Sequence, residues 1–185
     1  MNTFLLSLLS FLVLFSLAEA TTLKRKAKSE HLQTLICQTG VSLQVSGNYL
    51  NIQVSAWSST GTATGGSVVV NEYQEPSYCV NTAKGLVQNK DSGLYVVAYG
   101  NNGYTCFSPN CTPSWQLQVQ AVAQIAGNDW PWTVQTVTSG GKNYYAFTLT
   151  SAGVVGALTY SNGGISIQTY QAGQANQLWQ YVSSY

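Results

Sequence analysis

Charged side chains are scarce in this sequence. Lys and Arg together number 7 and Asp and Glu number 6 among 185 residues, so that charged residues make up 7% of the chain, against about 25% in an average soluble domain. Four of the basic residues fall in one short run, Lys24, Arg25, Lys26 and Lys28. A nucleic-acid partner requires a basic surface across a folded domain. The distribution of charge therefore excludes nucleic-acid binding.

The residue types that carry catalysis and metal binding are also few. His31 is the single histidine and no Cys-x-x-Cys pair exists, so neither a Ser-His-Asp triad nor a zinc site is expected. Glycoside hydrolysis needs two facing carboxylates, whereas Glu72 and Glu75 are three residues apart and would point to opposite faces of one strand. We therefore expect a protein that is not an enzyme and holds no metal or cofactor.

No apolar run is long enough to span a bilayer. The longest, residues 4–17, is shorter than the ~20 residues required; it is followed by Ala-Glu-Ala, and together they predict a cleaved secretory signal peptide over residues 1–20. Residues 21–35 contain the basic run and form either a solvated arm or a dibasic processing site. Residues 36–185 are expected to fold as one domain of a secreted, extracellular protein that does not insert into membranes.

The four cysteines, Cys37, Cys79, Cys106 and Cys111, are an even number in a chain with a signal peptide. We therefore expect two disulfides from among three connectivities, and we favour Cys106–Cys111 with Cys37–Cys79. Asn110-Cys111-Thr112 is an N-glycosylation sequon, which predicts a surface loop and a glycan on Asn110.

Short runs of alternating polarity dominate after residue 35, such as "LQVSGNYLNIQVSAW", "WQLQVQAV" and "ISIQTY", and Gly-rich turns such as "TSGG" and "SNGG" separate them. This pattern predicts an all-β domain. Related segments recur at a period of roughly fifty residues, with Trp132 and Trp179 at matching positions and Gly85 at the matching position of a first unit. Three degenerate units predict a closed threefold barrel with Trp179 in its core.

The segment "IQTYQAGQANQLW" (167–179) resembles the repeats of the ricin-type (ricin B-like) β-trefoil lectins, which end in Gln-x-Trp. The resemblance implies a β-trefoil of three degenerate repeats and a carbohydrate partner. It also implies that Tyr170 stacks on the sugar, that Asn176 supplies an amide and that Gln168 supports them. The middle unit instead reads "DWPW", the first has lost the motif, and no unit holds the Asp of the family's sugar site.

The first unit offers further candidate binding residues. Asn51 stands where the family has its Asp, and Trp57, Asn71 and Tyr73 add aromatic rings and an amide. An aromatic ring covers the apolar face of a pyranose, and amides hydrogen bond to its hydroxyls. The alternative for each ring is packing in the core or across strands.

These observations favour a secreted lectin-like protein that binds a neutral glycan by aromatic stacking and amide hydrogen bonds. One alternative is a protease inhibitor, in which the loop "GYTCFSPNCTPSW", held by Cys106 and Cys111, enters the cleft of a protease. Another is a structural extracellular protein that binds nothing. The sequence leaves all three open.

Overall fold

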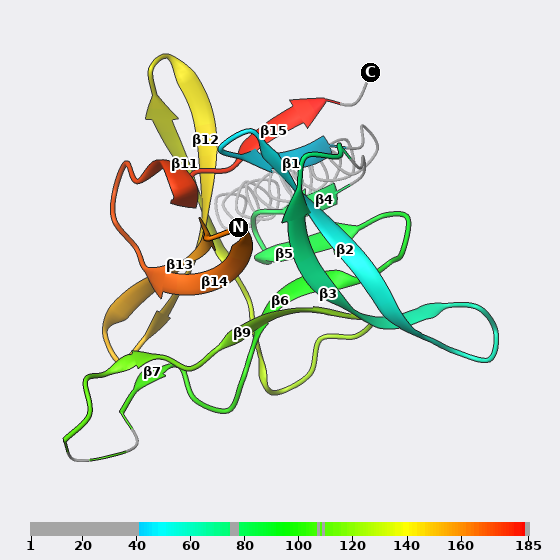
Figure 1. Cartoon of the computed structure of the whole chain (residues 1–185), viewed down its shortest axis with the longest axis horizontal. Helices are drawn as coiled ribbons and strands as arrows, with labels where there is room; N and C mark the ends of the chain where they lie inside the picture. The colour runs from blue at the N-terminus through cyan, green and yellow to red at the C-terminus, as the bar shows by residue number, and fades with distance from the viewer. Residues whose placement is uncertain (1–40, 75–77, 107, 109, 184–185) are drawn as a thin grey trace, which may run out of the picture. The chain divides into compact units, whose positions relative to one another are not determined.

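Short β-strands follow one another throughout the part of the chain that the structure describes. The structure is a computed structural model, and it describes residues 41–183 except 75–77, 107 and 109. In these residues the helical elements are limited to one 3-10 turn, η1 (Ala175–Gln177) (Figure 1). The prediction of an all-β protein is confirmed. The predicted signal peptide and N-terminal arm, with His31, lie outside the described residues.

Seven strands form a closed antiparallel barrel. The strands pair in the order β6-β5-β4-β1-β2-β3-β9, and pairing of β9 with β6 closes the ring. Closure gives each barrel strand a neighbour on both sides, although β1 meets β4 through the single pair Val41 and Tyr78. The seven strands are β1 (Val41–Val45), β2 (Asn48–Trp57), β3 (Ala63–Asn71), β4 (Tyr78–Asn81), β5 (Leu86–Asn89), β6 (Tyr95–Tyr99) and β9 (Gln118–Val122).

Further strands extend or accompany the barrel. β10 (Asp129–Trp130) pairs with β6, and β15 (Gln180–Ser183) pairs with β1. β11 (Thr133–Ser139), β12 (Lys142–Ser151), β13 (Val154–Ser161) and β14 (Gly164–Thr169) form a separate four-stranded meander. β7 (Tyr104–Thr105) and β8 (Ser114–Trp115) form a small hairpin of their own.

The Gly-rich turns of the meander lie where the sequence predicts them. Gly140 and Gly141 join β11 to β12, and Asn162 and Gly163 join β13 to β14; all four have positive φ. Two-residue hairpin turns of this kind require left-handed backbone, which Gly and Asn adopt most readily. No helix in the described part of the chain is long and apolar enough to cross a membrane.

The prediction of a β-trefoil is wrong. Three equivalent units would contribute equally to one threefold barrel, but the seven-stranded ring draws all its strands from residues 41–122. The segments that the repeat would match are not placed alike, because Leu50 and Val96 lie on barrel strands whereas Tyr145 lies in the separate meander. A weak sequence period predicts strands and turns, but the strand pairing depends on long-range partners that the period does not specify.

Trp179 lies in the core, as predicted. Its side chain is 0% exposed, its indole N–H donates to the Leu158 carbonyl at 3.1 Å, and its ring meets Phe147 edge to face. Its backbone also joins the meander to β15, because Tyr145 and Trp179 exchange two hydrogen bonds of 2.7 and 2.8 Å. Trp179 therefore contributes both to the core and to the contact between the two sheets.

Tyr181 places a phenol in the interior beside this junction. Its ring stacks on Tyr145 with centroids 3.8 Å apart, and its buried hydroxyl finds no hydrogen-bond partner among the described residues. Burial, and after it the neighbouring Tyr145, raises the pKa of the Tyr181 hydroxyl well above its usual range. The folded state therefore holds this hydroxyl in its neutral form.

We expect Tyr181→Phe to lose less stability than the wild-type protein does at alkaline pH. Above pH ~10 the unfolded chain ionises Tyr181 while the folded chain does not, so this residue lowers the free energy of unfolding by up to about 1.4 kcal/mol per pH unit. Below that pH the Tyr181 hydroxyl is neutral in both the folded and the unfolded state, so it no longer changes the free energy of unfolding. Urea titrations at neutral and alkaline pH should show that the free energy of unfolding falls less steeply with pH for Tyr181→Phe than for wild type. Tyr73→Phe, at an exposed position, serves as the control. Equal slopes for Tyr181→Phe and wild type would contradict this account.

Candidate functional site

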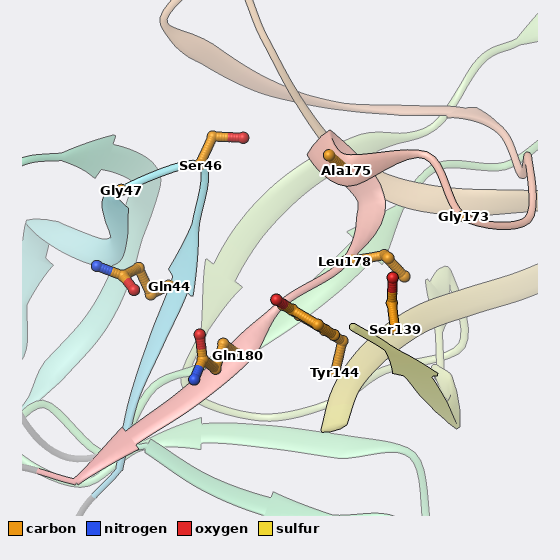
Figure 2. Close-up of a pocket in the computed structure, with 9 residues that line it drawn as sticks. All are labelled: Gln44, Ser46, Gly47, Ser139, Tyr144, Gly173, Ala175, Leu178 and Gln180. Carbon is orange, nitrogen blue, oxygen red and sulfur yellow. The ribbon is translucent and has the colours of Figure 1, made fainter. Parts of the chain in front are cut away.

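A cavity of about 320 Å³ opens where β1 and β15 approach β12 (Figure 2). This volume lies at the small end of the range for ligand pockets, roughly 300 to 1,000 Å³. Its lining includes Gln44, Tyr144, Leu178 and Gln180, with serine hydroxyls at the rim. Figure 2 shows the Tyr144 side chain extending across the cavity, with its hydroxyl between Leu178 and Gln180.

Three of these side chains form one row across neighbouring strands. Gln44 of β1 lies directly opposite Gln180 of β15. Next to the isolated antiparallel bridge between Tyr145 and Trp179, Tyr144 and Gln180 both line the cavity. Directly opposed residues of antiparallel strands point to the same face, with Cβ atoms about 4.5 to 5.5 Å apart. The row Gln44–Gln180–Tyr144 therefore presents two amides and a phenol ring side by side.

A tight turn forms the rim of the cavity on the β1 side. Ser46 and Gly47 have φ values of 49° and 82° and join β1 to β2, with Val45 paired to Asn48. Positive φ at both central positions is the geometry of a type I′ hairpin turn. The Asn48 amide donates to the Ser46 carbonyl at 3.2 Å and holds the turn. Figure 2 shows the Ser46 hydroxyl directed toward Ala175.

The pocket groups are uncharged and available for hydrogen bonding. None of the lining residues carries a charge. The amides of Gln44 and Gln180 and the hydroxyl of Tyr144 make no hydrogen bond to another described residue. Each glutamine amide offers both donors and an acceptor. The arrangement can therefore bind a neutral molecule that carries hydroxyl groups and an apolar face.

The third-unit residues predicted from the sequence are held by hydrogen bonds at different points of the meander. The Asn176 amide donates to the Tyr160 carbonyl at 2.9 Å, whereas the Tyr170 backbone N–H donates to the Val155 carbonyl at 2.8 Å. Tyr160 and Val155 stand five residues apart on β13, roughly 16 Å in an extended strand. The Gln168 amide donates to the Ser166 hydroxyl at 3.3 Å. The N–H groups of both predicted amides thus donate to internal acceptors, while the buried side-chain oxygen of Asn176 has no partner among the described residues.

Gln177, the first residue of the Gln-x-Trp motif, closes the loop that connects β14 to η1. It is 2% exposed; its carbonyl oxygen accepts from the Gln171 N–H at 2.8 Å, and its amide donates to the Thr159 hydroxyl and the Thr169 carbonyl at 3.1 and 3.0 Å. The motif therefore has a structural role in this chain, with the glutamine fixing a loop and the tryptophan filling the core.

The first-unit candidates divide into a cluster and an isolated ring. Asn51 donates to the Asn71 side chain and to the Tyr73 carbonyl, and the Asn71 oxygen accepts from the Tyr73 N–H at 3.0 Å. Because Asn51 is 2% exposed, its amide holds Asn71 and Tyr73 from the interior of the protein. Tyr73 is 70% exposed beside it, while Trp57, 62% exposed, lies at the far end of β2. One ligand of pyranose size cannot reach both rings.

The disulfide Cys106–Cys111 is confirmed, with Cα atoms 5.8 Å apart. It closes the loop between β7 and β8, and Asn110 is exposed there, so its glycosylation stays a prediction. Cys79 is also disulfide-bonded, but its predicted partner, Cys37, lies outside the described residues. The loop proposed for protease inhibition lies partly outside them as well, at 107 and 109.

Sequence reasoning missed the residues that line the cavity. Gln44 and Ser46 fall within a run that the polarity pattern treats as one segment, although the Ser-Gly dipeptide at Ser46 is a turn signal. Gln180 directly follows the Trp of the recognised motif, and Tyr144 lies in a tyrosine-rich strand. Nothing local in the sequence indicates that these strands become neighbours.

Comparison with known proteins adds no family assignment. No protein-family model matches this sequence, and no curated protein matches it. Function is therefore inferred from the geometry and chemistry of the chain itself.

Proposed function

We propose that this chain is a secreted, lectin-like protein that binds a neutral carbohydrate in the Gln44–Gln180–Tyr144 pocket and does not act as an enzyme. The observation that carries the proposal is the row of two unengaged amides beside a half-buried phenol ring, in a cavity without charged groups. The predicted signal peptide and the Cys106–Cys111 disulfide support export, because disulfides persist in oxidising compartments.

The chemistry of a sugar matches these groups. A pyranose ring has an apolar face of C–H groups that packs on an aromatic ring such as Tyr144. Its hydroxyls are both donors and acceptors, as are the amides of Gln44 and Gln180. Acidic or phosphorylated ligands would need Lys or Arg to compensate their charge, and the lining contains neither. The pocket therefore favours a neutral sugar.

The binding test uses the Tyr144 ring. We expect the mature protein to be retained on at least one of immobilised cellulose, mannan, xylan, chitin or galactan, and Tyr144→Ala to weaken the affinity at least about tenfold by removing the stacking surface. Tyr144→Phe keeps the ring and should bind within a few-fold of wild type. Retention should change little with salt, since neutral contacts are not screened.

Tyr170→Ala is the matched control, because Tyr170 lies outside the pocket lining. The Tyr170→Ala variant should bind the glycan as well as wild type does. If the sugar site were instead the one that the lectin resemblance implies, this variant would lose binding. Thermal unfolding of each variant checks that the fold persists. Absence of retention on every polysaccharide, or equal retention of Tyr144→Ala and wild type, would contradict the proposal.

A further inference from the structure

We infer that the ligand is a linear neutral oligosaccharide that lies across the strands from Tyr144 to Tyr49, and not a single terminal sugar. This inference rests on the proposed function and extends its site. The observation behind it is a second tyrosine in the same cross-strand row. Tyr49 of β2 lies directly opposite Gln44 of β1, so the row continues beyond the cavity as Tyr49–Gln44–Gln180–Tyr144.

The row lies on the outer face of these strands. Leu43, Val45 and Leu50 are at most 1% exposed and point into the core. Because side chains alternate along a strand, Gln44 and Tyr49 point to the opposite face. Tyr49 and Gln44 are both partly exposed, as are Gln180 and Tyr144. The four side chains are therefore accessible together.

The dimensions of the row exceed those of one sugar ring. Neighbouring strands lie about 4.8 Å apart, so the three spacings between β2, β1, β15 and β12 place Tyr49 and Tyr144 roughly 14 Å from each other. A single pyranose cannot contact both rings. A chain of linked sugars can place one ring on each tyrosine and present its intervening hydroxyls to the two glutamine amides.

The order of the groups matches the chemistry of such a chain. Apolar ring faces and hydroxyl groups alternate along a linear glycan, and the row reads aromatic, amide, amide, aromatic. None of the four residues is charged, so nothing in the row favours a chain of acidic sugars. The open geometry suits an internal segment of a neutral polysaccharide.

The number of sugar units in the ligand is the variable that tests this inference. We would measure, by calorimetry, the affinity of the full mature protein for monosaccharides, disaccharides, trisaccharides and tetrasaccharides of the cello, manno, xylo, chito and galacto series. In at least one series the tetrasaccharide should bind at least about tenfold more tightly than the monosaccharide, since the longer ligand also stacks on the Tyr49 ring. Tyr49→Ala should lower the ratio of the two affinities about tenfold.

Tyr49→Phe is expected to keep the length dependence, because the stacking surface is the ring. Tyr99→Ala, on β6 and outside the row, controls for loss of a partly exposed tyrosine. Affinity that does not change with chain length, or a length dependence that Tyr49→Ala leaves intact, would overturn the inference while the proposed function stands. If the wild-type protein binds no member of any series, the proposed function fails with it.

Discussion

Replacing Trp179 by alanine is expected to lower the free energy of unfolding by about 3 to 5 kcal/mol, the usual cost of truncating a fully buried tryptophan. Trp179 is 0% exposed, packs edge to face on Phe147 and donates to the Leu158 carbonyl. Its loss leaves a cavity and an unpaired carbonyl in the core. Since single domains are stable by only about 5 to 15 kcal/mol, much of the protein's stability should disappear. Urea unfolding followed by far-ultraviolet circular dichroism measures the change.

Trp57→Ala makes the same chemical change at a surface position and serves as the control. Trp57 is 62% exposed at the end of β2, so its truncation should alter the free energy of unfolding by no more than about 0.5 kcal/mol. If both variants lost equal stability, Trp179 would not be the core residue described here.

Gly85→Ala should destabilise the fold by about 3 kcal/mol or more, from two separate causes. Gly85 has φ of +64°, a left-handed conformation that a Cβ disfavours. In addition, a Cβ there would overlap the carbonyl group of Trp132, whose N–H donates to the Gly85 carbonyl at 3.1 Å. Backbone cannot move aside as a flexible side chain can, so the clash should displace Trp132 from the core. Thermal and urea unfolding would report the loss.

Gly93→Ala separates the two causes. Gly93 has φ of +73°, close to that of Gly85, but a Cβ there would meet no atom within 4 Å. Only the conformational cost of about 1 to 2 kcal/mol should remain. The difference between the two variants measures the overlap with Trp132. Equal losses would show that the close packing of Gly85 against Trp132 has no energetic effect.

The sequence predicted the local structure of this chain better than its topology. Turn positions such as Gly140 and Asn162 followed from composition, whereas burial of Trp179 was predicted correctly but from a threefold repeat that the fold does not contain. The β-trefoil did not hold, because the apparent repeat matched segments with different strand partners. Local preferences determine where a strand begins and ends, whereas pairing of β6 with β9, or of β1 with β15, depends on contacts far apart in the chain.

Sequence analysis did not find the pocket residues for a related reason, and the site that the lectin resemblance implies stays a prediction. The resemblance drew attention to Asn176 and Gln168, yet the structure uses these amides in internal hydrogen bonds. An amide that holds a loop and one that binds a ligand are the same in a sequence. What distinguishes Gln44 and Gln180 is that register places them opposite each other with no internal partner, and register across β1 and β15 cannot be deduced from either strand alone.

The bridge between Tyr145 and Trp179 means that a ligand in the pocket would contact both sheets of the fold. Gln44 and Gln180 belong to the barrel and its added strand, whereas Tyr144 belongs to the meander, and the bridge is the backbone pairing that joins β12 to β15. A ligand that contacts Tyr144 and Gln180 together therefore acts as a clamp between the two sheets. By mass action, such a ligand makes their separation less favourable as its concentration rises. If the proposed function holds, attachment to a polysaccharide would therefore strengthen the junction between β12 and β15 against separation of the two sheets.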